Sequence, residues 1–239
     1  MAVARRQPEQ QAPPVQRVRV QYAKRGRLRF TSHRDVSRAV ERAVSRARLP
    51  IAFSSGFHPH PRISYAGASP TGAASEAEYL ELAMAEVTDP ADVGRRLDAA
   101  LPEGIDVVSA VESPGGSLAD RLEASRWLVD LTGVGLAEVA AAVDRFLAEE
   151  SVEVERMTKK GVRRFDCRAA VVSLTVGEEP DRVRLDLLLR HGTPAVRATD
   201  VLTGLVEGAG LPPVADPLLT RLAQGTLPAD AVEVGDPFA

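Results

Sequence analysis

Alternating apolar and polar residues near the start of the chain predict a strand. Val18, Val20 and Tyr22 share one face, and Arg17 and Arg19 lie on the other. Residues 17–24 therefore read as a half-buried strand with a basic outer face. Gly26 permits a tight turn, after which residues 28–30 continue as extended chain.

A helix is predicted to begin after Ser32, an N-cap residue that is followed three positions later by Asp35 in place of the usual Glu or Gln of a capping box. It should run to about Arg48 and stop before Pro50. Its apolar stripe has the 3.6-residue period of a helix with one buried face. The stripe consists of Val36, Ala39, Val40, Ala43, Val44 and Ala47.

The remaining patterns predict an α+β protein made of two halves in tandem. In the first half, strands are expected at 51–54, 63–65, 76–86 and 105–111, and a helix capped by Asp89 runs through Leu101. We read the order of the main elements as strand, helix, strand, strand, helix, strand, which is the ferredoxin-like (βαββαβ) pattern.

The second half repeats this order by topology, without evident sequence identity. Strands are predicted at 127–132, 152–157, 182–189 and 218–222, with helices at 136–149 and 198–207. Residues 168–176 form an additional strand, which would give this half an extra hairpin with 182–189. The expected division is a disordered leader (1–16), a basic ferredoxin-like domain (17–112), a linker (113–124), a second ferredoxin-like domain (125–223) and an acidic disordered tail (224–239).

Composition changes this picture in one respect, the distribution of charge. The 239 residues carry a net charge of −3. Residues 1–62 hold 14 Lys and Arg against three acidic residues, a balance of +11, and the remainder carries −14. Such asymmetry is typical of a protein with one end that meets a polyanion, and a solvated basic face without a partner is the alternative.

Other features of the sequence exclude several classes. No run of 18 apolar residues and no apolar leader occurs, so we expect a cytoplasmic protein without a membrane partner. A single cysteine, Cys167, suits a reducing compartment and is expected to be a buried small residue. Phosphate-loop, dinucleotide and nucleophile-elbow motifs are absent, so nucleotide hydrolysis and acyl transfer lack support.

Part of the basic charge recurs every four residues of the first helix, at Arg34, Arg38, Arg42 and Arg46. Four residues advance about 400°, so these side chains form a slowly turning row on one side. Like charges at this spacing weaken an isolated helix by a few tenths of a kcal/mol per pair. Contact with phosphates would explain the row, and chance use of Arg as a good helix former is the alternative.

Two motifs in this half carry a resemblance to a known family. They are Phe30-Thr31-Ser32-His33-Arg34-Asp35 and the segment from Ser54 to Pro61, flanked by Lys24-x-Gly26 and by Gly72, Ser75 and Glu78. Over about residues 17–90 the chain resembles the uncharacterised proteins encoded beside, or fused to, radical SAM proteins. The resemblance implies a radical SAM protein as partner and no reaction. Cys167 alone cannot supply a three-cysteine cluster motif, so this chain is not expected to be the radical SAM enzyme itself. We expect no cofactor.

Combined with the charge pattern, the resemblance leads to an RNA-binding accessory protein that presents structured RNA, such as tRNA or rRNA, to that partner for modification. The predicted RNA-binding residues are Arg34, Arg38, Arg42, Arg46, Gly56, Phe57, His60, Arg62, Lys159 and Lys160. Phe57 and Tyr65 would stack on unpaired bases, and Phe57 is equally a candidate for a small core. Lys159 and Lys160 belong to a second basic loop, for which a solvated hairpin tip is the alternative.

Two further functions stay open. In the first turn of a helix, where an anion is favoured, a neutral His33 would act as a general base on a ribose hydroxyl, with Asp35 as its companion. That would make the protein a metal-independent endoribonuclease, a reading supported by a weaker likeness to CRISPR-processing endoribonucleases. Alternatively His33 only hydrogen-bonds the 56–61 loop, and Asp35 caps the helix. The other open function is an adaptor that binds no RNA, in which the basic row would contact an acidic surface of the radical SAM protein. His33, His58 and His60 would suit zinc only if they converge, and we predict no metal site.

Overall fold

The computed structural model describes residues 10–158 and 161–239, which form a mixed α+β protein with four α-helices and mostly antiparallel strands. The chain divides into two compact units. Unit 1 comprises the chain up to Thr71, Glu78–Leu118 and Phe238, and unit 2 comprises Gly72–Ala77, Ala119–Pro237 and Ala239. Within the described part, no helix is long and apolar enough to cross a membrane.

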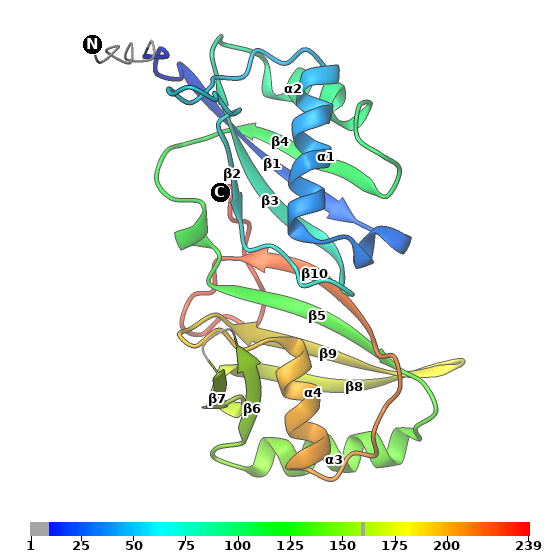
Figure 1. The fold of residues 1–239 in the computed structure, drawn as a ribbon. Coiled ribbons are helices and arrows are strands. Elements are labelled where there is room, and N and C mark those ends of the chain that lie inside the picture. The colour runs from blue at the N-terminus through cyan, green and yellow to red at the C-terminus, as the bar shows by residue number, and fades with distance from the viewer. Residues whose placement is uncertain (1–9, 159–160) are drawn as a thin grey trace, which may run out of the picture. The chain divides into compact units, whose positions relative to one another are not determined.

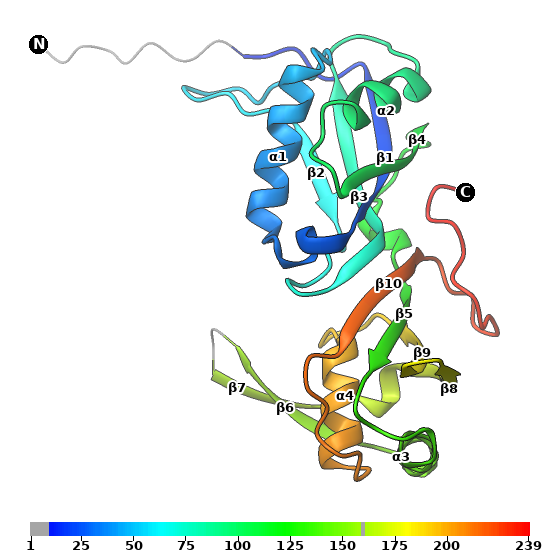
Figure 2. The same cartoon turned by 90° about the vertical axis from the view of Figure 1, so that its right-hand side faces the viewer.

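Unit 1 contains a sheet with two helices packed on one face (Figures 1 and 2). Its strands have the order β4-β1-β3, and β2 pairs with β3. The elements are β1 (Gln16–Lys24), α1 (His33–Arg46), β2 (Ile63–Ala66), β3 (Ala74–Met84), α2 (Pro90–Asp98) and β4 (Ile105–Glu112).

The apolar stripe of α1 packs as its period predicts. Val36, Val40, Ala43 and Val44 are buried in one cluster with residues of α2, β1 and β3. At the helix start, Ser32 is the N-cap and accepts a hydrogen bond from the Asp35 N–H. The helix ends at Arg46, two residues earlier than predicted, because Arg48 has a positive φ of 51°.

Three local predictions in unit 1 are wrong. Residues 26–30 form a 3-10 helix, η1 (Gly26–Phe30), instead of a turn and extended chain. The stretch 51–54 makes only the isolated bridges Ile51–Met84 and Phe53–Pro61. The second face of β1 is not a basic outer face, because Arg19 has no exposed surface at all.

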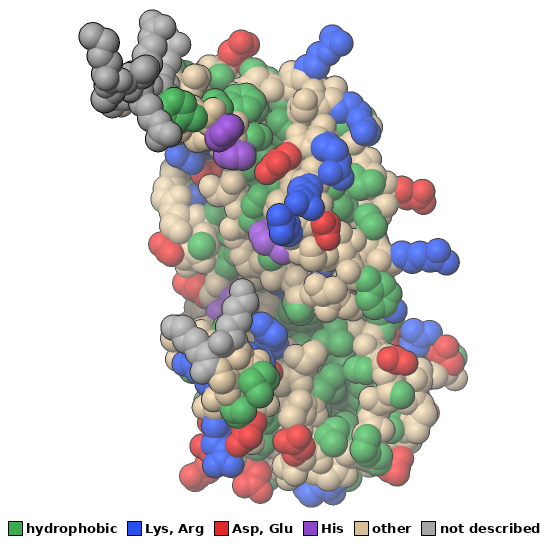
Figure 3. All heavy atoms as spheres, viewed as in Figure 1, with side chains coloured by type: hydrophobic (Ala, Val, Ile, Leu, Met, Phe, Trp, Pro, Cys, Tyr) green, Lys and Arg blue, Asp and Glu red, His purple; other side chains and the backbone are tan. Residues whose placement is uncertain are grey.

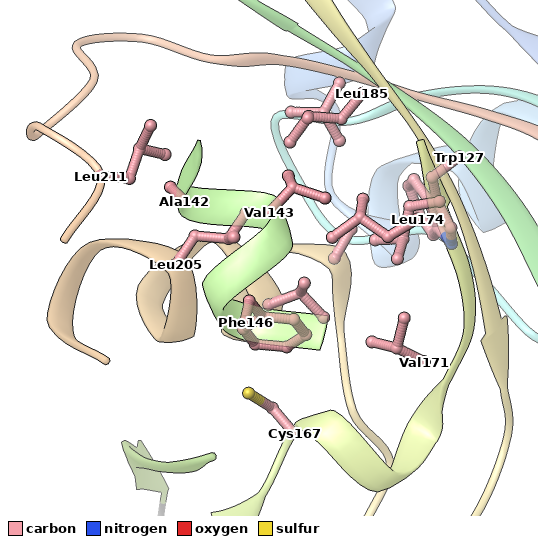
Figure 4. Packing of buried hydrophobic residues seen from close by; sticks show 14 of the residues in the cluster. Trp127, Ala142, Val143, Phe146, Cys167, Val171, Leu174, Leu185, Leu205 and Leu211 are labelled. Atoms are coloured by element: carbon pink, nitrogen blue, oxygen red, sulfur yellow. The ribbon is translucent and has the colours of Figure 1, made fainter. Parts of the chain in front are cut away.

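The strands of unit 2 have the order β10-β5-β9-β8, and two helices pack on one face of them. Its elements are η2 (Ala119–Arg121), β5 (Ala124–Leu131), α3 (Leu136–Ala148), β6 (Glu153–Thr158), β7 (Gly161–Asp166), η3 (Arg168–Ala170), β8 (Val171–Glu179), β9 (Arg182–Arg190), α4 (Ala198–Glu207) and β10 (Leu218–Gly225). Its core holds Phe146, Leu205 and the buried Cys167, as predicted for that thiol (Figure 4). The first residues of β3 belong to this unit because Ala74 and Ser75 pair in parallel with β10.

The predicted hairpin of residues 168–176 with 182–189 is confirmed, whereas the strand predicted at 152–157 lies outside the main sheet. The strand expected at 168–176 pairs with β9, as β8, and both are members of the main sheet. By contrast, β6 and β7 pair with each other as a separate two-stranded sheet that stands off from the rest of the unit in Figure 2.

The segment after Gln224 was expected to be a disordered tail, and it is packed in part. Leu227 is buried with Ala124 and Leu188, and its N–H donates to the Glu123 carboxylate at 2.7 Å. Phe238 stacks edge-on against Tyr79, with the ring centroids 5.4 Å apart. An acidic composition therefore did not prevent the few apolar residues of this segment from finding buried positions.

Candidate nucleic-acid interface

The arginine row of α1 is exposed along its whole length. The apolar stripe of α1 packs against the sheet, so the other side of the helix faces solvent. This exposed side carries Arg34, Arg38, Arg42 and Arg46. Figure 3 shows the basic side chains gathered over α1. The row therefore lies on the surface, as the sequence predicts.

These guanidinium groups have few partners of their own. Arg38 lies 3.7 Å from Asp35, and both side chains are more than half exposed, so the pair contributes little. Arg46 Nη1 donates to the Ala100 carbonyl at 3.2 Å, which occupies one of its guanidinium nitrogens. Across residues 10–158 and 161–239, neither Arg34 nor Arg42 has a hydrogen bond or ion pair. The row thus keeps most of its hydrogen-bonding capacity for a ligand.

Asp35 is occupied in capping the helix. Its carboxylate accepts from the Ser32 hydroxyl at 2.7 Å, while its N–H donates back to Ser32 Oγ at 3.3 Å. No hydrogen bond joins Asp35 to His33. The capping role that the sequence allowed is therefore the one that the geometry supports.

His33 is exposed at the first position of α1, and its ring forms a T-shaped contact with Tyr65, with the centroids 5.1 Å apart and the planes at 85°. The Tyr65 hydroxyl is directed at the Ser37 carbonyl, 3.5 Å away. Burial, the largest cause, raises the pKa of Tyr65 to about 12, so this phenol stays neutral. Tyr65 thereby provides a fixed surface for the imidazole, and no hydrogen bond ties His33 to the 56–61 loop within the described residues.

The 54–62 loop is closed by its own backbone. The Ser54 N–H donates to the His60 carbonyl at 2.9 Å, the His60 N–H donates to Ser54 Oγ at 3.0 Å, and Arg62 Nε donates to the Phe53 carbonyl at 3.1 Å. Gly56 has a φ of 133°, a backbone conformation that residues with a side chain rarely adopt.

This closure turns the tip of the loop outward. Phe57 is 68 % exposed, so it does not plug a core, and His58 and His60 are exposed as well. In the part of the chain that the structure describes, no three His, Cys, Asp or Glu side chains gather as a metal site, so His33, His58 and His60 do not converge.

One surface residue escaped sequence reasoning. Phe30 is 61 % exposed, and the Arg29 guanidinium carbon lies 4.6 Å from its ring centroid. The signal was present in the sequence, as an aromatic residue beside Arg in the turn before a helix.

The second basic loop lies only partly within the described residues. Lys159 and Lys160 lie outside the described residues. Arg163 and Arg164, which follow on β7 of unit 2, are exposed, and Arg164 lies 3.4 Å from both Glu153 and Glu155.

Two residues of the recognised motif are structural instead of exposed. Ser75 is fully buried and accepts from Arg221 Nε at 3.2 Å, and Glu78 is buried and accepts from the Ser69 N–H at 3.1 Å. Their polar groups satisfy buried partners, so they are not available to a ligand.

Fold and surface together define a mixed α+β protein with one exposed, arginine-lined helix. The chain belongs to the family described as "Uncharacterized protein conserved in bacteria (DUF2344)", whose model matches residues 17–198. No curated protein matches the chain.

Solved structures that match include a chain from "Crystal Structure of a Cbf5-Nop10-Gar1 Complex", with a TM-score of 0.46 and 11 % identity. The match covers 92 % of this chain and 56 % of that chain, so this protein spans little more than half of its length. This similarity is too weak to support an argument about function.

Proposed function

We propose that this protein binds structured RNA through α1 and the 54–62 loop, and presents that RNA, such as tRNA or rRNA, to a radical SAM partner for modification. The observation that carries the RNA-binding part is the exposed arginine row, in which Arg34 and Arg42 have no partner among the described residues. The partner rests on the motif resemblance alone.

The dimensions of the row suit a polyphosphate strand. At about 1.5 Å per residue, the distance along the helix from Arg34 to Arg46 is about 18 Å. A stacked strand carries one phosphate per roughly 3.4 Å, so about five phosphates pass along this length. Four arginines on such a strand would release counterions, which makes binding strongly dependent on salt.

A salt titration tests the proposal. If the four arginines each neutralise one phosphate, the logarithm of the affinity should fall against the logarithm of salt with a slope of about 2.8 for a single strand and about 3.6 for a duplex. Fluorescence anisotropy of a labelled RNA hairpin, measured at several salt concentrations, gives this slope. Arg38→Glu combined with Arg42→Glu should lower it by about 1.4 to 1.8.

Arg95→Glu provides the matched control, because Arg95 is exposed on α2 of the same unit and is paired with Asp92 at 3.1 Å. The comparison is made with the single variant Arg42→Glu. Equal losses of RNA affinity in Arg42→Glu and Arg95→Glu, or weak binding that does not depend on salt, would contradict the proposal. Capture of a radical SAM protein after RNase treatment, without any RNA binding, would favour the adaptor. Cleavage of RNA in EDTA that is lost in His33→Ala would favour the endoribonuclease.

We also infer that each unit is a ferredoxin-like half. Support comes from the strand orders β4-β1-β3 with β2 on β3, and β10-β5-β9-β8, each with two helices on one face. With the β6–β7 hairpin set aside, both units follow the succession strand, helix, strand, strand, helix, strand.

A further inference from the structure

Phe30 points outward because of the local backbone conformation. In an extended chain, Leu28 and Phe30 would share one face. In η1, with about 120° per residue, the chain turns by about 240° between them, so they point about 120° apart. Leu28 packs against the unit 1 core, and Phe30 remains 61 % exposed. A large apolar ring held at the surface in this way has no part in the core.

A cation already lies against this ring. The Arg29 guanidinium carbon is 4.6 Å from the Phe30 centroid, within the range of a cation–π contact. The guanidinium lies over one face of the ring, so a base would stack on the opposite face.

A second aromatic surface follows closely in the chain. His33 is three residues after Phe30, which limits their Cα separation to about 11 Å. The His33 ring is exposed and forms the T-shaped contact with Tyr65. Next to it, Arg34 has no partner among the described residues and is free to contact a phosphate.

We propose that Phe30 and His33 are stacking surfaces for unpaired bases of the RNA, an inference that rests on the proposed RNA binding. Binding modules for single strands combine aromatic faces with nearby cations in this way, because every base has a face that can stack. The ligand class is then RNA with an unpaired loop, bulge or end next to a helical stem. The arginine row takes the phosphates, and the aromatic pair takes the bases.

Two RNA probes separate stacking from charge. One is a hairpin whose single-stranded loop carries a 2-aminopurine reporter, and the other is a blunt duplex with the same number of phosphates. Phe30→Ala should weaken binding of the looped hairpin by about 5- to 150-fold, the usual range for one stacked base. It should leave duplex affinity and the salt slope unchanged, since no charge is removed.

The controls keep the test specific. Phe30→Tyr retains the ring and should bind the loop as wild type does. Val87→Ala, which trims a residue that is 80 % exposed in the same unit, should have no effect on either probe. His33→Ala should weaken binding of the looped hairpin. It should also reduce the change in 2-aminopurine fluorescence that accompanies binding.

Each result decides between the two ideas. If both probes bind in a salt-dependent way and Phe30→Ala has the same affinity as wild type, the stacking inference is overturned and the proposed RNA binding stands. Equal losses on the looped hairpin and the duplex would also overturn it. Failure of the wild-type protein to bind either probe would overturn the proposed function, and the stacking inference with it.

Discussion

Replacing Glu81 with Leu should destabilise the protein strongly, because it removes the carboxylate of a buried ion pair. Arg19 has no exposed surface, and its Nε lies 3.1 Å from Glu81 Oε2. Its Nη2 donates to the carbonyls of Gly115 and Gly116 at 2.8 and 2.9 Å, while Nη1 is buried with no hydrogen-bond partner. Without Glu81, a guanidinium charge would remain in the interior with only neutral acceptors.

The expected loss is about 3 to 5 kcal/mol of unfolding free energy, the usual cost of leaving one member of a buried pair uncompensated. Adding Arg19→Met should recover at least half of this loss, because a buried pair replaced by apolar side chains is often tolerated. Arg17 also contacts Glu81, at 2.8 Å, but its side chain is half exposed. Arg17→Met should therefore cost no more than about 1 kcal/mol.

The dependence of stability on acid pH should show the contribution of the same ion pair. Burial opposes ionisation of Glu81, but hydrogen bonds from Arg19, Arg17 and Ser113 outweigh it, so the pKa of Glu81 lies below its usual range. The unfolded chain then binds more protons, so the stability due to this group is present above about pH 4.3 and is lost as pH falls through the lower folded pKa. Glu81→Gln should remove this part of the acid dependence.

Urea unfolding followed by circular dichroism measures all of these free energies. The single Trp127 belongs to unit 2, so its fluorescence is the less suitable probe. A loss below about 1 kcal/mol in Glu81→Leu, or a double variant less stable than Glu81→Leu, would refute the reasoning that the charge of Arg19 depends on this carboxylate.

Two further predictions concern the core of unit 2. Gly204→Ala should destabilise by about 1 to 3 kcal/mol, against the usual gain for Gly to Ala in a helix, because the new Cβ would lie 2.7 Å from Cys167 Sγ. Gly192→Ala, whose Cβ meets nothing within 4 Å, should be near neutral in the same urea titration. Cys167 should resist a thiol reagent at pH 8 until urea is added, because burial, the largest cause, raises its pKa to about 12 and leaves about one thiol in ten thousand ionised. Rapid labelling of the native protein would contradict that expectation.

The helix that carries the candidate site could be predicted from the sequence in some detail. The Ser32 cap, the buried stripe with Val36 and Val40, and the exposed arginines on the other side all follow from residues three or four positions apart. Once one face of a helix must be buried, the direction of every other side chain on it is fixed by the helical period. For that reason the arginine row was located correctly.

The direction of Phe30 and the separate β6–β7 hairpin of unit 2 could not be predicted in this way. Leu28 and Phe30 fit a strand pattern of period two, and only the 3-10 turn of η1 separates their directions. The hairpin formed by β6 and β7 and the one formed by β8 and β9 are both plausible local pairings, but only the second joins β5 in the main sheet. Which hairpin enters a sheet depends on contacts with strands far away in the chain.

The sequence by itself determined the order of the four α-helices, the cap of α1 and its two faces, because these depend on neighbouring residues. Only the tertiary structure decided the environment of Arg19, which alternation placed on an outer face. Whether the second face of a strand meets water depends on what covers it, and here the chain near Gly115, 96 residues away, supplies the carbonyls. Arginine is therefore a candidate for ligand contact on the surface of α1 and a buried member of an ion pair on β1.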